Sequence, residues 1–208
     1  MVIENIRPED LSKRRLQIVD RELEKRGITL DEQWAYIIKE CIDATGDFDF
    51  AENLYFSKSA VEEITRGLAS GCHIITDSKM SQTGIIKELA DAHGNRVMCF
   101  VNAEDVIEEG RRRGCTPGYI SMEKALLLER PILFLVGEDP EAIRSILRLK
   151  EEEVLNPVAV IGTPAGFLNV EESKKMLMAS PIPCIVTRGS KGGSHVAAAI
   201  VNAIQGKM

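Results

Sequence analysis

The sequence of 208 residues has no long apolar run and only three histidines. No apolar stretch approaches the ~20 residues that a membrane-spanning helix needs, and the charged residues Glu4, Arg7 and Asp10 leave no apolar signal-peptide core. The five cysteines contain no CxxC pair, and no histidine lies at zinc-site spacing from a cysteine. We therefore expect reduced, structural thiols in a soluble, cytoplasmic protein without a metal site.

Excess positive charge is missing too. The net charge is −6, which argues against nonspecific binding to nucleic acid through a global positive field. An anionic ligand would have to be attracted by local clusters of Arg and Lys. The 44% hydrophobic and 28% charged content is ordinary for a globular protein. A chain of this length fits one domain, so we expect residues 1–208 to form a single one.

The usual signatures of nucleotide cofactors and of nucleophilic enzymes are also lacking. The glycine-rich segments do not have Walker A spacing, and no GxGxxG is followed by a downstream acidic residue. No Ser-His-Asp or Cys-His arrangement stands out. These absences argue against a bound nicotinamide dinucleotide and against a nucleophilic triad.

What the sequence does contain is an alternation of short apolar strands with amphipathic helices. Continuous apolar strands separated by helices indicate a parallel sheet that is covered on both faces. The pattern predicts a three-layer α/β/α sandwich with a mostly parallel sheet of about five strands, and ligand binding at the carboxyl ends of those strands. Strands are expected at 73–76, 97–101, 131–136, 158–161 and 184–186, and helices at 8–26, 31–44, 57–69, 81–91, 104–113, 121–129, 141–153, 171–178 and 196–204.

Two glycine-containing loops follow the last two predicted strands. The first runs over 162–169 and the second over 188–194, where Arg188 and Lys191 lie among three glycines ahead of a helix. Backbone N–H groups with nearby cations are suited to carboxylate or phosphate groups. Neighbouring loops of this kind predict one shared hollow for a ligand with several negative groups, with Phe167 as an apolar wall. The alternative is a pair of tight turns with solvated charges.

An acidic cluster lies at the predicted end of the second helix, where Asp43, Asp47 and Asp49 follow Glu40. A carboxyl group whose neighbours favour protonation could transfer a proton. The alternative is a solvated helix end, although carboxylates there oppose the helix dipole. Glu172 and Lys174 are expected to face solvent. His195 could bind an anion or serve only in packing.

Several segments together resemble the precorrin-8X methylmutase family. The two glycine-containing loops look like the hallmark loops of that family. The order and spacing of the segments agree over nearly the whole chain. The segments that carry the resemblance are 162–167 with 172–174, 188–194, 77–80 with Gly84, 56–57 and 44–47.

The resemblance implies an isomerase of corrin-ring synthesis that moves a methyl group between adjacent ring carbons of precorrin-8X or cobalt-precorrin-8. It also implies a cofactor-free homodimer that binds the tetrapyrrole near the subunit interface. Such a ring carries many acetate and propionate side chains, which suit anion-binding loops. The expected product is hydrogenobyrinate or cobyrinate.

The chain departs from the family pattern where the chemistry is expected. The family has a proton-transferring histidine where this chain has Asp43, and usually an arginine where it has Glu40. A serine that contacts substrate in relatives is replaced by Arg15. The sequence after the third strand, 137–142, also differs. Because aspartate ordinarily titrates about two and a half pH units below imidazole, Asp43 could act only if Glu40 and Asp47 or burial raised its pKa.

Three hypotheses follow from this comparison. In the first, the chain is a methylmutase that uses Asp43 as acid or base, or whose proton comes from substrate or water. In the second it is a divergent paralogue that acts on another polycarboxylate, and in the third a non-catalytic tetrapyrrole-binding protein. Asp43 is the predicted catalytic residue. The predicted substrate-binding residues are Arg15, Glu40, Ser57, Asp77, Met80, Thr163, Gly166, Arg188, Lys191, Gly192 and Ser194.

Overall fold

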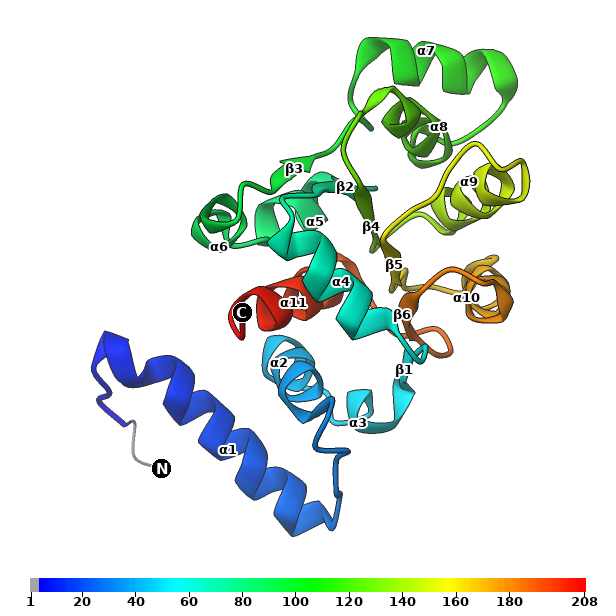
Figure 1. The fold of residues 1–208 in the computed structure, drawn as a ribbon. Coiled ribbons are helices and arrows are strands. Elements are labelled where there is room, and N and C mark those ends of the chain that lie inside the picture. The colour runs from blue at the N-terminus through cyan, green and yellow to red at the C-terminus, as the bar shows by residue number, and fades with distance from the viewer. Residues whose placement is uncertain (1–3) are drawn as a thin grey trace.

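A computed structural model describes residues 4–208, so that 1–3 of the expected domain lie outside it. It contains a six-stranded sheet in the order β1-β6-β5-β4-β2-β3 with helices on both faces (Figure 1). All neighbouring strands are parallel except β1 and β6. The predicted three-layer sandwich is confirmed. The strands are β1 (Leu54–Phe56), β2 (His73–Thr76), β3 (Arg96–Met98), β4 (Ile132–Val136), β5 (Ala159–Gly162) and β6 (Cys184–Thr187).

The helices form two layers, and one helix lies outside them (Figure 1). One face of the sheet is covered by α2 (Ala35–Thr45), α4 (Ala60–Ala69), α5 (Lys79–Gly84), α6 (Lys87–Ala92) and α11 (Ser194–Gln205). The other face carries α8 (Pro117–Lys124), α9 (Pro140–Glu151) and α10 (Val170–Ala179), with α7 (Glu104–Arg113) beside α8. The outlying helix is α1 (Leu11–Arg26), which packs against α2. Short pieces are η1 (Pro8–Asp10), α3 (Phe50–Asn53) and η2 (Ala125–Leu127).

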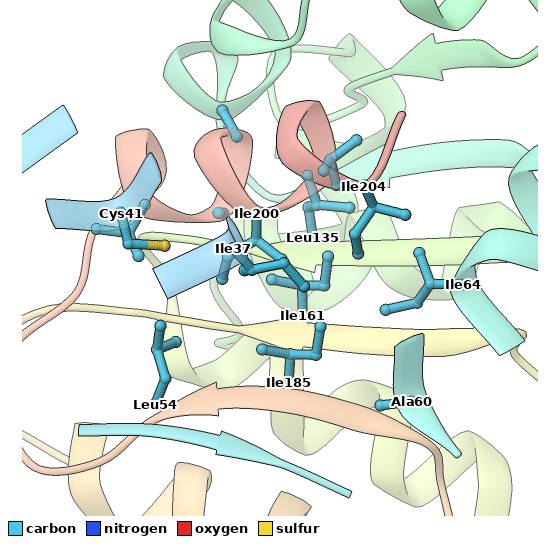
Figure 2. Packing of buried hydrophobic residues seen from close by; sticks show 14 of the residues in the cluster. Ile37, Cys41, Leu54, Ala60, Ile64, Leu135, Ile161, Ile185, Ile200 and Ile204 are labelled. Atoms are coloured by element: carbon cyan, nitrogen blue, oxygen red, sulfur yellow. The ribbon is translucent and has the colours of Figure 1, made fainter. Parts of the chain in front are cut away.

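The core explains why the strands are apolar without interruption. Along β4, Leu133 and Leu135 face one cluster of buried residues, whereas Phe134 and Val136 face the other. Successive side chains of a strand point to opposite faces, so a sheet that is covered on both sides needs apolar residues at every position. Figure 2 shows the first of these clusters, where Leu135, Ile161 and Ile185 from neighbouring strands meet Ile37 and Ile200 from α2 and α11.

Several elements differ from the sequence-based expectation. The short helix α3 was not predicted, and the helix expected over 121–129 is found at 117–124 as α8, followed by η2. Two further differences have a clear physical reason. The first strand, β1, was not predicted, because three residues beside a loop carry too little periodicity to indicate a strand; antiparallel pairing with β6 forms it. The helix expected over 81–91 is divided into α5 and α6. The amide of Asn202 in α11 accepts from the Ile86 N–H and donates to the Gly84 carbonyl, so a side chain from another helix supplies bonds at the break.

The described helices include none that is long and apolar enough to cross a membrane. All five cysteines are free, and Cys41, Cys72 and Cys184 are buried. Burial raises the pKa of the Cys72 thiol to about 12 and that of Cys184 to about 11. These values hold the thiols protonated at neutral pH, which agrees with the structural role expected for them.

Candidate functional site

The loops that follow β5 and β6 lie together at the carboxyl edge of the sheet. The Gly166 N–H donates to the Ser190 carbonyl at 3.0 Å, and the Gly193 N–H donates to the Thr163 carbonyl at 2.5 Å. The Thr163 hydroxyl also donates to the Gly193 carbonyl. The loops are therefore neighbours, as expected, but the expectation of a hollow between them is wrong at this point, because their backbones are in direct contact.

Two glycines make this contact possible. Gly192 has φ +154°, and a Cβ atom there would collide with the Thr163 carbonyl oxygen. Gly166 has φ +132°, a conformation that residues with a side chain rarely adopt. Both glycines were predicted as site residues, and both shape the backbone of the loops.

Lys174 of α10 lies beneath the second loop and is fully buried. Its ammonium group donates to the carbonyls of Gly189 at 2.9 Å and Lys191 at 2.8 Å. Burial lowers the pKa of Lys174 to about 8. The expectation that Lys174 faces solvent is therefore wrong. One signal could have found it: Val170, Lys174 and Leu177 share one helical face by their spacing, and that face is buried.

Asp77, at the end of β2, lines a hollow, as expected for a pocket wall, and it also binds the loop after β4. Its buried carboxylate accepts hydrogen bonds from the backbone N–H groups of Gly137, Glu138 and Asp139 at 2.9, 2.8 and 2.7 Å. Burial raises the pKa of Asp77 to about 6, against the opposing effect of these three bonds. The side chain therefore connects the ends of β2 and β4.

Ser194, the first residue of α11, is also buried and joins the same network. Its hydroxyl lies 2.8 Å from that of Ser78, which follows Asp77. The second glycine-containing loop is thereby fixed to the end of β2 on one side and to the loop after β5 on the other. The side-chain polar groups of Thr163, Asp77 and Ser194 are all hydrogen-bonded within the protein.

A hollow of about 560 Å³ opens beside this network between the ends of β2 and β4. The chain turns from β2 toward β3 on one side and continues from β4 toward β5 on the other. Such switch points are the usual ligand crevices of open α/β sheets. Met80 is 64% exposed here, as suits a ligand contact. The lining residues include Met80, Asn102, Gly118, Glu138 and Asp139.

Lys191 of the second loop pairs with Asp47 and Asp49, two acidic residues that follow α2. The Lys191 ammonium lies 2.6 Å from a carboxylate oxygen of Asp47 and 2.5 Å from one of Asp49. The hydrogen bond from Lys191 lowers the pKa of Asp47. Asp47 is therefore a paired carboxylate, and the expectation that it helps to raise the pKa of Asp43 is not supported by this arrangement.

Asp43 and Glu40 lie one turn apart on α2, facing α1. An oxygen of Asp43 lies 3.4 Å from the Arg15 guanidinium, and the Asp43 side chain is only 15% exposed. Burial, and secondarily the Asp43 charge, raises the pKa of Glu40, whereas Arg15 opposes the shift. The carboxyl group with the raised pKa in this cluster is therefore Glu40.

A second hollow, of about 630 Å³, lies beside this cluster between α1, α2, α6 and α11. It is polar on the α1 and α2 sides, while Ile86 and Leu89 supply apolar surface. It could accept part of a large ring that also carries charged groups. Its lining residues include Ser12, Arg15, Glu40, Ile86, Leu89 and Asn202.

Arg188 and Ser57 occupy opposite ends of β6. The Arg188 guanidinium lies at the carboxyl end, 5.5 Å from the centre of the Tyr55 ring. Ser57 lies at the amino end, where its hydroxyl accepts from the Cys184 N–H. Antiparallel β1 causes this separation, because Phe56 pairs with Ile185. Within this chain, Ser57 therefore lies at the opposite edge of the sheet from the predicted site residues that follow β5 and β6.

His195 is exposed in the first turn of α11, and its ring lies next to Gly193. His73, by contrast, lies at the amino end of β2. His195 is thus the histidine that shares the carboxyl edge with the glycine-containing loops.

Comparison with known proteins adds to this geometry. The family model described as "Precorrin-8X methylmutase" matches residues 10–206. A cobalt-precorrin-8 methylmutase of Priestia megaterium is 32% identical over 96% of this chain and 88% of its own length. That of Salmonella typhimurium is 37% identical over 81% of this chain and 79% of its own. The structure of precorrin-8x methyl mutase from Thermus thermophilus superposes with a TM-score of 0.84 at 27% identity, covering 94% of this chain and 96% of the other.

Proposed function

Because this chain belongs to the precorrin-8X methylmutase family, we propose that it moves a methyl group between adjacent ring carbons of precorrin-8X or cobalt-precorrin-8. The protein is an isomerase of cobalamin biosynthesis. The observation that supports the proposal is the grouping of Arg15, Asp43 and Glu40 beside the hollow between α1, α2, α6 and α11. Relatives named for the cobalt form favour cobalt-precorrin-8.

The proposed roles follow from exposure and charge. Arg15, Arg188 and Lys191 present cations at the surface and would bind ring carboxylates. Asp43 would exchange a proton with the conjugated ring, and Glu40, whose pKa is raised, would hold a proton beside it. Holding the ring rigidly contributes to the rate because the migration is intramolecular.

The direct test is incubation of the purified protein with precorrin-8X and, separately, with cobalt-precorrin-8. The optical spectrum would report formation of hydrogenobyrinate or cobyrinate. Turnover of either substrate supports the proposal, and the ratio of the two kcat/KM values identifies the preferred form. Tight binding of the product without turnover would instead favour the non-catalytic tetrapyrrole-binding protein.

We also propose that residues 1–208 act as one cytoplasmic domain that forms a homodimer without nucleic-acid, membrane or cofactor partners. Leu11 and Ile18 on the outlying helix α1 are each 45% exposed. Apolar side chains at such a position suit burial against a second copy. Light scattering coupled to size-exclusion chromatography should give twice the chain mass of 23.0 kDa.

Replacement of Lys191 separates binding from folding. In Lys191→Met, the free energy of unfolding should change by less than about 1 kcal/mol, because the ion pairs with Asp47 and Asp49 are exposed. The KM should rise several-fold, since one cation of the proposed carboxylate site is lost. Urea titration and steady-state kinetics measure the two effects, and an unchanged KM would remove Lys191 from the substrate site.

A further inference from the structure

Among residues 4–208, the loop between β6 and α11 has four successive backbone N–H groups without acceptors, those of residues 189–192, and two of them are set by Lys174. Among residues 4–208, neither the Ser190 N–H nor the Gly192 N–H has a hydrogen-bond acceptor, although neighbouring Arg188 and Gly193 donate to Asn53 and Thr163. Ser190 is exposed and Gly192 is half-buried, so a ligand can approach both.

Lys174 determines which way these donors point. The Gly189 carbonyl and the Ser190 N–H belong to one peptide group, and the Lys191 carbonyl and the Gly192 N–H belong to the next but one. The described chain has no cis peptide bond. In a trans peptide the carbonyl and the N–H point in opposite directions. Because Lys174 binds both carbonyls, both N–H groups point away from its ammonium group.

We propose that Ser190 N–H and Gly192 N–H bind one carboxylate of the substrate, and that Lys174 is the positioning residue that holds them in place. Successive donors of this kind form concave anion sites. The buried ammonium adds positive charge on the far side of the same two peptide groups. A neutral side chain in place of Lys174 would free the carbonyls to rotate and would remove that charge. The inference rests on the proposed function, because it assigns a ligand group to that site.

The ligand class follows from the donor set. Two N–H groups from alternate residues can meet the two oxygens of a planar carboxylate. The Lys191 ammonium, which lies beside Asp47 and Asp49, is proposed to bind a different ring carboxylate from the one that these N–H groups hold. An acetate or propionate arm of the ring would meet this loop at the exposed Ser190.

The test compares Lys174→Met with Lys175→Met on the same helix. Lys175 is 64% exposed and pairs with Glu171, so its replacement serves as the matched control. The probes are cobyrinate and its neutral heptamethyl ester. We expect Lys174→Met to bind cobyrinate at least about tenfold more weakly than the wild type, a loss of about 1.4 kcal/mol. The ester should bind both proteins equally, and Lys175→Met should match the wild type with either probe.

The pH profile gives a second readout. Because burial lowers the pKa of Lys174 to about 8, its charge is lost as the pH rises through that value; Glu171, the charged group that perturbs it, opposes the shift. The affinity of the wild type for cobyrinate should therefore fall toward that of Lys174→Met as the pH rises from 7 to 9. Equal affinities at pH 7 in a folded variant would overturn the proposal.

A third measurement does not depend on any variant folding. Titration of the isotope-labelled wild type with cobyrinate should shift the amide signals of Ser190 and Gly192 downfield. If cobyrinate binds and these two signals do not move, the inference is wrong while the proposed function stands. If the wild type neither binds nor converts any corrin, the proposed function itself fails.

Discussion

Asp43→Asn is expected to lower kcat at least about 100-fold while KM changes little, because an amide cannot exchange the proton that the ring requires. Asp43 is largely buried beside Arg15 and Glu40, so the substitution keeps the shape of the side chain while it removes the acid–base function and the charge paired with Arg15. The measurement is steady-state turnover of cobalt-precorrin-8 and precorrin-8X. Asp43→His should keep or raise kcat, since imidazole transfers protons near neutral pH.

A matched control for this experiment lies on α1. Asp20 is a carboxylate in the hollow that Arg15 and Glu40 also line, and it pairs with Lys39 at 2.6 Å. Asp20→Asn should leave kcat within about twofold of the wild type. Full activity of Asp43→Asn would remove Asp43 from the mechanism, and Glu40→Gln would then test the neighbouring carboxyl, whose pKa is raised.

The second large effect is expected on stability. In Asp77→Ala, three backbone N–H groups lose their acceptor, and the loop after β4 loses its connection to β2. Each orphaned group costs about 1–3 kcal/mol where water cannot replace the acceptor. We therefore expect the free energy of unfolding to fall by about 3–5 kcal/mol, as measured by urea titration.

Asp105→Ala provides the comparison for Asp77→Ala. The Asp105 carboxylate is 67% exposed and pairs with Lys124 at 2.5 Å. Exposed pairs of this kind contribute less than about 1 kcal/mol. If both variants lose the same small amount of stability, the three hydrogen bonds to Asp77 do not hold the loop as described. Asp77→Asn should fall between the two, because its amide keeps one acceptor oxygen.

The regular part of the fold could be predicted from local pattern. The five parallel strands and the helix Glu104–Arg113 were predicted with bounds close to or equal to those observed, because continuous apolar runs and helical spacing are local properties. The break between α5 and α6 could not be predicted, since Asn202, which supplies its hydrogen bonds, lies more than a hundred residues away. The strand β1 likewise depends on its partner β6.

Candidate site residues could be predicted only by type. The sequence shows that glycines, serines and carboxylates follow the strands. It does not show which of their polar groups remain free of hydrogen bonds within the protein. Thr163, Asp77 and Ser194 turned out to bond within the protein. Ser57 lies at the far end of β6, because only the pairing register shows which end of a strand a residue occupies.

The sequence alone determined the layered α/β architecture, the resemblance to the family and the cationic, glycine-containing loop, because periodicity and residue type are present before folding. The tertiary structure alone decided that Lys174 is buried beneath that loop and that Asp47 is neutralised by Lys191. It also decided that Glu40 has the raised pKa. The physical reason is that burial and charge pairing depend on groups that are distant in the chain and meet only when the helices pack on the sheet.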